Sequence, residues 1–300
     1  MNFVDTHIHL SHFLYEYNFP CCEPPESNPR VTYQTRESLI EKMKNLNIKY
    51  CIDPAIGIDT NSRIIEFCEK YPDFIFGAVG VHPKRAADTD PDKFTLVEEL
   101  SLNPCVVAIG EAGLDYSYEG FENDISIQKE FFVRQIELAH IRKLPLVLHI
   151  RDAFSDGDDI LYSYRDKLHG GVAHCFNGNS EEARFLVEKL DLSIGIGASI
   201  FLDEREELRT AVKNTPLDHI LLETDGPYVR MPFCENLLSE SPDSDECVPL
   251  SKKKWKKARN SSVIIPTIAQ EIAFLHNISV EEVAQVTSEN ADKIFRQSRA

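Results

Sequence analysis

The sequence predicts an α/β fold, a (β/α)8 TIM barrel with a two-helix C-terminal extension. Eight short apolar runs recur along the chain, and a segment with apolar residues three and four positions apart follows almost every one. Most runs are continuously apolar, which is typical of parallel strands covered on both faces. Eight such units over about 230 residues match a (β/α)8 barrel, which needs roughly 250. A doubly wound open sheet is the competing architecture, but no GxGxxG follows the first run.

The expected elements alternate regularly from the N-terminus. Strands are expected within residues 2–10, 48–56, 74–82, 106–114, 144–152, 170–176, 192–199 and 219–227. Helices are expected within residues 37–46, 61–71, 92–100, 126–143, 158–168, 180–190 and 204–214, each with charge opposite its apolar face. Segments 264–277 and 279–295 predict two final helices, the second with Ser279 as N-cap and Glu282 three residues later.

We expect one domain over residues 1–300, with loop insertions at about 11–36 and 230–258. The first insertion contains "PCCEPPESNP", and the second joins the acidic "SESPDSDE" to the basic "KKKWKK". Both follow expected strands, which places them at the C-terminal face of a barrel, where active sites are built. The basic run has two interpretations: a surface for single-stranded nucleic acid with Trp255 as a stacking ring, or a solvated linker that balances the preceding acids.

The formal charge of −17 restricts the classes of partner. Such a surface repels nucleic acid at long range, which disfavours broad electrostatic binding of a duplex. It does not exclude a nucleic-acid substrate, because bound divalent metals can reverse the local charge inside a cleft.

The apolar runs and the cysteines indicate in which cellular compartment the protein is expected. No apolar stretch approaches the ~18–20 residues of a membrane span, and no secretory signal is visible. The eight cysteines include no CxxC pair, so a cysteine zinc site is improbable and reduced thiols are expected. We therefore expect a cytoplasmic protein, with a nuclear location also open, no membrane partner and no evident obligate protein partner.

Polar residues that suit metal ions recur at the ends of the expected strands. They are His7 and His9 in the first, Glu111 in the fourth, His149 in the fifth, His174 in the sixth and Asp225 in the eighth. Residues two apart on a strand point to the same side, so the first two can both face the barrel axis. Imidazole and carboxylate suit zinc, manganese and related ions. Six ligands are too many for one tetrahedral ion but suit two ions that share a carboxylate.

Each of these residues also has an ordinary structural interpretation. A lone strand histidine is usually a core or surface residue, and Glu111 could pair with an arginine. The occurrence of all six residues at the ends of expected strands favours metal binding. Two further residues, His82 after the third run and Arg151 after the fifth, are candidate substrate contacts. The histidine could instead cap the following turn, and the arginine could instead form a salt bridge to Asp152 or Asp115.

Several motifs together resemble the TatD family of metal-dependent deoxyribonucleases, which belong to the amidohydrolase-like barrels. They are "DTHIHL", "VGVHP", "GEAGLDY", "PLVLHIRDA", "HCFNG", "ETDGPY" and "SENADKIF", and the similarity runs from Val4 to Phe295. The resemblance implies that one ion is held by His7, His9, Glu111 and Asp225, and the other by Glu111, His149 and His174. Many other amidohydrolase-like barrels bridge their ions with a modified lysine, and no lysine stands near Glu111.

The chain departs from the family pattern at two places. The family's first loop is usually compact, whereas here it is long and rich in proline. The family commonly shows "RNEP" after the last strand, and this chain has "RNSS" at residues 259–262. Neither departure touches the six expected ligands.

These observations lead to one functional hypothesis and two alternatives. We expect a metal-dependent phosphodiester hydrolase, a deoxyribonuclease that acts from strand ends like an exonuclease, with single-stranded DNA or strand ends as its substrate. It would use two divalent ions (Mg, Mn or Zn) to activate water, Asp225 as general base and Glu111 to position the ions. The rival enzyme class is a small-molecule hydrolase of a lactone, amide or phosphotriester. A non-catalytic scaffold barrel is the other alternative. His12, past the expected strand end, is expected to be solvated and dispensable.

Overall fold

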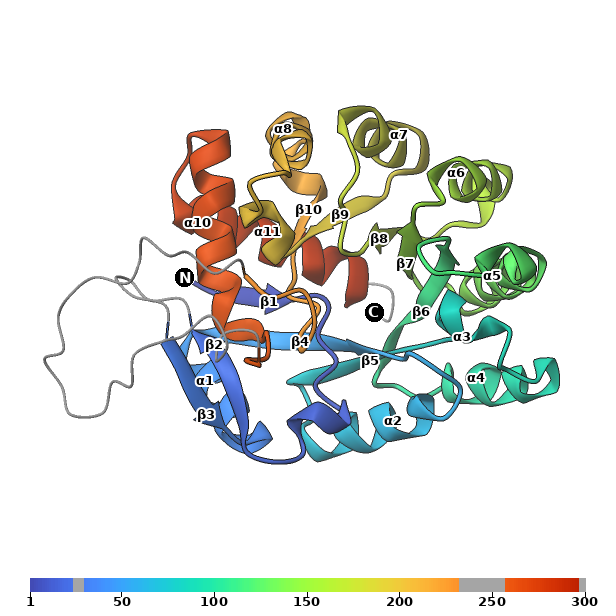
Figure 1. Cartoon of the computed structure of the whole chain (residues 1–300), viewed down its shortest axis with the longest axis horizontal. Helices are drawn as coiled ribbons and strands as arrows, with labels where there is room; N and C mark the ends of the chain where they lie inside the picture. Colours follow the sequence, from blue (N-terminus) through green and yellow to red (C-terminus); the bar gives the residue numbers. More distant parts are fainter. Residues whose placement is uncertain (24–29, 232–256, 297–300) are drawn as a thin grey trace, which may run out of the picture.

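Eight parallel strands form one sheet that curls round until its first and last strands meet (Figure 1). The structure, a computed structural model, describes residues 1–23, 30–231 and 257–296. In sheet order the strands are β1 (Phe3–Asp5), β4 (Ile48–Pro54), β5 (Ile75–Val79), β6 (Val106–Asp115), β7 (Leu146–Arg151), β8 (Gly171–Ala173), β9 (Ser193–Ile196) and β10 (Ile220–Leu222). The Thr6 amide donates to the Leu222 carbonyl at 3.0 Å, and Ile8 bridges to Gly226, so the ring closes. The predicted barrel is confirmed.

Helices surround the sheet on its outside, and most of them lie between successive strands in the sequence (Figure 1). They are α1 (Arg36–Asn45), α2 (Thr60–Lys70), α3 (Pro83–Ala86), α4 (Phe94–Leu100), α5 (Ile125–Arg142), α6 (Phe154–Ser163), α7 (Ser180–Leu190), α8 (Glu206–Asn214), α10 (Ile265–His276) and α11 (Val280–Phe295). The predicted C-terminal pair corresponds to α10 and α11. The Ser279 side chain accepts a hydrogen bond from the Glu282 amide, which confirms the expected N-cap.

The last helix closes one end of the barrel. Seven of the eight strands contribute to a buried apolar cluster that consists of Val4, Tyr50, Ile52, Ala78, Val107, Ala108, Val147, Val172 and Leu221. Ala291 and Phe295 of α11 complete this cluster. Because residues on opposite strands can meet only through the barrel interior, α11 seals its N-terminal end. The opposite, C-terminal end is left for polar side chains.

The first strand is shorter than expected, and this changes how His7 and His9 are held. β1 ends at Asp5, so both histidines lie beyond the strand. Past Asp5 the backbone forms hydrogen bonds to β4 on one side and to the loop after β10 on the other. The Ile8 amide donates to the Ile52 carbonyl, and the His9 amide donates to the Gly226 carbonyl. The chain therefore stays extended between β4 and the loop after β10, and its residues still alternate in direction.

The first insertion is more ordered than the expected Pro-rich loop. It contains a turn of 3-10 helix at Phe13–Tyr15 and an antiparallel hairpin of β2 (Phe19–Glu23) and β3 (Arg30–Gln34). The hairpin contacts the "RNSS" segment, because the Arg259 amide donates to the Pro20 carbonyl at 2.6 Å and Cys21 Sγ lies 2.9 Å from Ser261 Oγ. The two departures from the family pattern thus contact each other.

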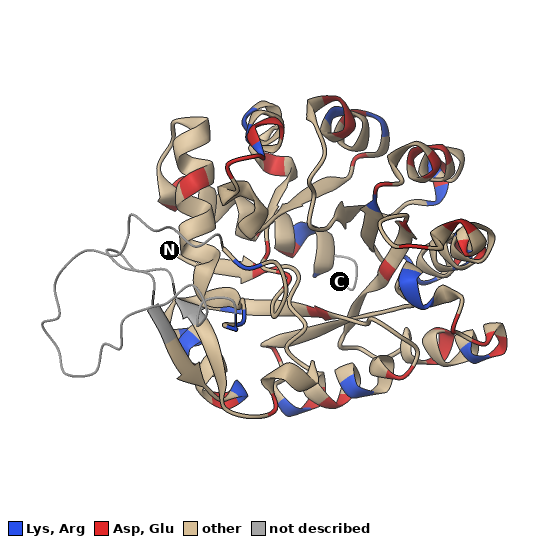
Figure 2. Cartoon of the chain, viewed as in Figure 1, with Lys and Arg blue, Asp and Glu red and all other residues tan. Residues whose placement is uncertain are grey.

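Most of the second insertion, with Trp255 and nearly all of the basic run, lies outside the described residues, so both of its interpretations stay predictions. In the view of Figure 2, lysines, arginines and acids are interspersed on the outer helices. No described helix is by itself long and apolar enough to cross a membrane. The segments 262–276 and 280–295 have the length and hydropathy of a membrane span only when taken together, and they are bent by 109° relative to each other.

Candidate metal centre

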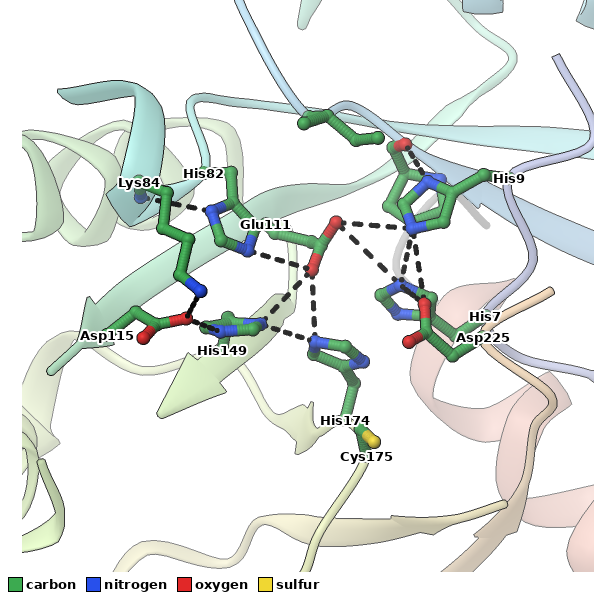
Figure 3. A network of polar contacts seen from close by, with 12 residues as sticks. His7, His9, His82, Lys84, Glu111, Asp115, His149, His174, Cys175 and Asp225 are labelled. Atoms are coloured by element: carbon green, nitrogen blue, oxygen red, sulfur yellow. Dashed lines mark hydrogen bonds and ion pairs between the residues drawn. The ribbon is translucent and has the colours of Figure 1, made fainter. Parts of the chain in front are cut away.

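The six residues expected to bind metal converge at the C-terminal mouth of the barrel (Figure 3). Glu111 lies in β6 and His149 in β7, while His174 directly follows β8 and Asp225 follows β10. Histidines and carboxylates from strands far apart in the sequence therefore face one another. Glu111 occupies the middle of the group, with its two oxygens directed to opposite sides.

On one side of Glu111 lie the two N-terminal histidines and Asp225. His9 Nε2 is 3.5 Å from Glu111 Oε1 and 3.3 Å from Asp225 Oδ1. His7 Nε2 is 3.8 Å and 3.6 Å from the same two oxygens. The two imidazole Nε2 atoms are 3.4 Å apart. We name His7, His9 and Asp225 the β1 side of the centre.

The backbone conformation at Asp225 directs its side chain toward His7 and His9. Its φ of 52° lies in the left-handed region, which aspartate adopts more readily than most residues. The Asp225 amide donates to the His7 carbonyl at 2.8 Å, and the Asp225 carbonyl accepts from the Tyr228 amide at 2.8 Å. These hydrogen bonds hold a tight turn at the end of β10.

On the other side of Glu111 lie His149 and His174, which we name the β7 side. His174 Nε2 is 3.0 Å and His149 Nδ1 is 3.4 Å from Glu111 Oε2. His149 Nδ1 and His174 Nε2 are 2.8 Å apart. Both imidazoles thus direct one nitrogen to the same carboxylate oxygen.

Groups that were not predicted from the sequence face the outer nitrogens of three histidines, and two of them lie within hydrogen-bond distance. His9 Nδ1 lies 3.1 Å from the Pro54 carbonyl, and His149 Nε2 lies 2.9 Å from Asp115 Oδ2. His174 Nδ1 is 3.8 Å from Glu223 Oε1. Such outer partners fix the tautomer and orientation of a metal-binding histidine.

The position of Glu223 is built into the fold. It is fully buried, and it accepts a hydrogen bond from the Cys175 amide, next to His174. A Cβ atom on Gly195 would collide with the Glu223 carboxylate, so the glycine makes room for it. A signal was present in the sequence: Glu223 stands two residues before Asp225, and Asp115 ends the strand that carries Glu111.

The electrostatics of the centre are shaped by burial and by its carboxylates. Burial opposes the charge of His9, but Asp225 and Glu111 overcome it and raise the pKa of His9 to about 9. Asp115 and Glu111 likewise raise the pKa of His149 to about 9. Burial, reinforced by His174, holds the pKa of His7 well below its usual range. Burial would raise the pKa of Glu111, yet the surrounding histidines hold it well below its usual range.

The donor set suits divalent metal ions. Among the described residues, His7 Nδ1, His174 Nδ1, Glu111 Oε1 and Glu223 Oε2 are buried polar atoms without a hydrogen-bond partner. His7, His9 and Glu111 offer ligand atoms that all lie within 4.8 Å of one another, and so do His82, Glu111 and His149. Buried imidazoles and a carboxylate packed this closely, with polar atoms unsatisfied, are typical of zinc, manganese and related sites.

The two expected substrate contacts are placed differently. His82 caps α3, because its Nδ1 accepts from the Lys84 amide at 3.0 Å, and its Nε2 lies 3.9 Å from Glu111 Oε2. The capping interpretation is thus correct, and a substrate contact stays a prediction. Within the described residues Arg151 forms no salt bridge to Asp152 or Asp115, so the structural alternative for this arginine is not supported. Asp115 pairs instead with Lys84 at 3.3 Å.

Arg151, the last residue of β7, lines a cleft of about 540 Å³ that it forms with residues that follow β7 and β8 and with residues at the start of α8. Phe154, Asn177 and Arg205 lie on its walls, together with Asp152, Gly178, Asn179, Glu182 and Glu207. The Arg205 Nε atom is buried without a hydrogen-bond partner among the described residues. Two arginines and three acids thus line one cleft, so of these charged residues only the arginines could contact an anion such as a phosphate.

Comparison with known proteins identifies the family. The model of the family described as TatD related DNase matches residues 4–296. The chain belongs to this family. Membership confirms the resemblance drawn from the motifs, and with it a metal-dependent hydrolase that acts on ester bonds.

Similar proteins cover nearly the whole chain. The "Uncharacterized metal-dependent hydrolase YabD" of Bacillus subtilis is 32% identical over 97% of this chain and 98% of its own length. The "3'-5' ssDNA/RNA exonuclease TatD" of Yersinia pseudotuberculosis is 34% identical over 86% of this chain and 92% of its own. The crystal structure of YJJV, a TatD homolog from Escherichia coli, has the same fold, with a TM-score of 0.77 at 21% identity over 98% of this chain and 97% of its own.

Proposed function

We propose that this TatD-family protein degrades single-stranded nucleic acid from a strand end, with two divalent ions held on the two sides of Glu111. The observation that carries the proposal is the convergence of the four imidazoles expected as ligands, those of His7, His9, His149 and His174, on the two oxygens of this one carboxylate. Relatives named as 3'-5' exonucleases of single-stranded DNA and RNA support the substrate class. The charge of −17 also favours a strand end in the cleft over a wrapped duplex.

The close packing of these residues supports the two ligand sets that the family resemblance implies. His7, His9, Glu111 and Asp225 would hold one ion, and Glu111, His149 and His174 the other. Divalent ions bound there would neutralise phosphate charge and lower the pKa of a water. Magnesium, manganese and zinc all fit a set of imidazoles and carboxylates in chemical type.

The residues of the chain supply the remaining chemistry. Asp225, whose Oδ1 faces the centre, would accept the proton of the attacking water as general base. Glu111 would hold the two ligand sets at a fixed distance from each other, because its carboxylate contacts histidines of both sets. Arg151, with no salt bridge to its acidic neighbours, would hold a non-bridging phosphate oxygen through its planar fork. His82 would contact the substrate through its Nε2 edge.

A nuclease assay tests the proposal. Single-stranded DNA and RNA labelled at either end, and duplex DNA, are incubated with the protein in magnesium, manganese, zinc or EDTA. We expect stepwise shortening of single strands with metal and none with EDTA. Asp225→Asn should lower the rate by roughly 10²–10⁴-fold, whereas Asp218→Asn, an exposed aspartate just before β10, should leave it unchanged.

Two outcomes would overturn the proposal. One is metal-loaded protein that leaves every nucleic acid intact but opens lactones or cleaves phosphotriesters, which would assign it to the small-molecule hydrolases. The other is protein that binds no divalent ion by elemental analysis after manganese treatment, which would favour a scaffold barrel.

A further inference from the structure

A row of aromatic rings leads from the metal centre to the protein surface on the β1 side. The ring of Tyr228, which follows Asp225 in the loop after β10, packs edge-on against His9 with centroids 5.6 Å apart. His12 lies 5.6 Å from Tyr228, and the Phe13 ring lies 4.3 Å from His12. Tyr228 is 40% exposed and Phe13 is 62% exposed. The row therefore presents aromatic surface to solvent directly beside the expected ligands.

Hydrogen bonds fix the orientation of these rings. The Leu14 amide donates to His12 Nδ1 at 3.1 Å, so the neutral imidazole carries its hydrogen on Nε2. That Nε2 lies 3.0 Å from the Tyr228 hydroxyl and donates to it. His12 is thus half-buried and bonded at both nitrogens, in contrast to the solvated residue expected from the sequence. The hydroxyl hydrogen of Tyr228 is left free for another acceptor.

The backbone beneath the row is also held in place. Arg36 donates to the Leu10 carbonyl at 2.8 Å and to the His12 carbonyl at 3.0 Å. Arg63 donates to the intervening Ser11 carbonyl at 2.7 Å. Two guanidinium groups therefore bind three consecutive carbonyls, so a ligand that stacks here would not have to order the loop first.

We propose that Phe13, His12 and Tyr228 form a stacking subsite for a nucleobase at the end of a single strand whose scissile phosphate lies at the metal centre. This inference rests on the proposed function and adds to it a substrate-binding site on the β1 side. Stacking on aromatic rings tolerates any base and does not depend on net charge, which suits an acidic nuclease. Arg151 and Arg205, which line a separate cleft, would then be left to contact phosphates of the strand.

Fluorescence quenching tests the subsite without relying on turnover. A single-stranded oligonucleotide with 2-aminopurine at its terminal position is titrated with Asp225→Asn protein in magnesium. Stacking should quench the fluorophore. Adding Tyr228→Leu or Phe13→Leu to this background should weaken binding about tenfold and remove most of the quenching. Tyr228→Phe should retain the quenching because it keeps the ring, and Phe274→Leu, which removes another exposed phenylalanine on α10, should match the parent.

Kinetics with an abasic terminal nucleotide provide the second measurement. In otherwise unmodified protein, Tyr228→Leu and Phe13→Leu should raise KM about tenfold for a normal strand, with less effect on kcat. The same variants should leave KM unchanged for a strand that ends in an abasic site. Equal losses on both strands would overturn the subsite, because they would show that the rings act through the metal centre.

The failures of the two proposals can be told apart. Quenching that depends on Tyr228 and Phe13, without cleavage of any strand by the wild type, would retain the subsite and reject the proposed hydrolysis. Cleavage of single strands with quenching unaffected by either leucine variant would retain the proposed hydrolysis and reject the subsite.

Discussion

The two sides of the metal centre are supported in different ways. On the β1 side, the outer nitrogen of His9 contacts a backbone carbonyl, and His7 Nδ1 has no hydrogen-bond partner among the described residues. On the β7 side, the outer nitrogens of His149 and His174 face the carboxylates of Asp115 and Glu223. A backbone carbonyl therefore faces an outer histidine nitrogen on the β1 side, whereas carboxylates face the outer nitrogens on the β7 side.

The difference follows from where each side lies in the barrel. The β1 side is built where the first and last strands meet, and there the backbone itself crosses between neighbours at Ile8 and Gly226. The β7 side is built on the adjacent strands β7 and β8, and its partners are two buried carboxylates, Asp115 at the end of β6 and Glu223 directly after β10. Point substitutions should therefore weaken the support of His149 and His174 more readily than that of His9, because a backbone carbonyl is not removed by changing a side chain.

Removing the residue shared by both sides should have the largest effect. Glu111→Gln takes away the charge that both sets of imidazoles contact, so we expect loss of both ions and a rate lower by roughly a thousandfold or more. Elemental analysis of protein equilibrated with manganese measures the first effect. Glu122→Gln, which changes an exposed glutamate in the 3-10 turn (Phe121–Asn123) before α5, is the matched control. Retention of a full metal complement by Glu111→Gln would show that the two sides are independent.

Removing one histidine should affect one side only. We expect His9→Ala to lose the ion of the β1 side and His174→Ala the ion of the β7 side, each with a rate roughly 10²-fold or more below the wild type. Metal titration by calorimetry should show one binding step lost in each variant. His169→Ala, an exposed histidine, should bind as the wild type does. Loss of both steps in either variant would contradict the division into two sides.

The outer carboxylates should have an intermediate effect. Asp115→Asn and Glu223→Gln keep size but replace the carboxylate that faces a histidine, so metal affinity or activity should fall by about 10–100-fold. The loss should appear in the binding step of the β7 side and not in that of the β1 side. An equal loss in both binding steps would indicate a general change in folding.

The smallest expected effect concerns pH and His12. Burial, together with nearby positive groups, lowers the pKa of His12 to about 4 in the folded protein. Between that value and the ordinary value near 6.5 the unfolded chain binds the extra proton, so wild-type stability falls as the pH drops through this window. His12→Gln should remove on the order of 1 kcal/mol of this pH dependence, since the ring is partly exposed to water. Denaturant unfolding at pH 4.5 and pH 7.5 measures it, and parallel curves for the two proteins would contradict the assignment.

Much of the fold and of the centre could be predicted from the sequence. Apolar runs such as 106–114 match buried strands because a barrel strand is covered on both faces, and the polar residues that interrupt the ends of such runs are the ones that converge. The ends of the first and last strands were predicted too late, and residues beyond Asp5 remain extended while they pair with two different neighbours. The hairpin in the first insertion was missed, since a Pro-rich composition does not reveal strand pairing.

The sequence by itself determined the barrel, the family and the six converging residues, because apolar periodicity and residue chemistry are local properties. Only the tertiary structure decided which atoms support them. Asp115, Glu223 and the Pro54 carbonyl become partners of histidines through contacts between strands, and no local pattern specifies such contacts. The same holds for the row of aromatic rings from His9 to Phe13. Tyr228 lies more than two hundred residues further along the chain, and it joins the row because it contacts both His9 and His12 where the first and last strands of the barrel meet.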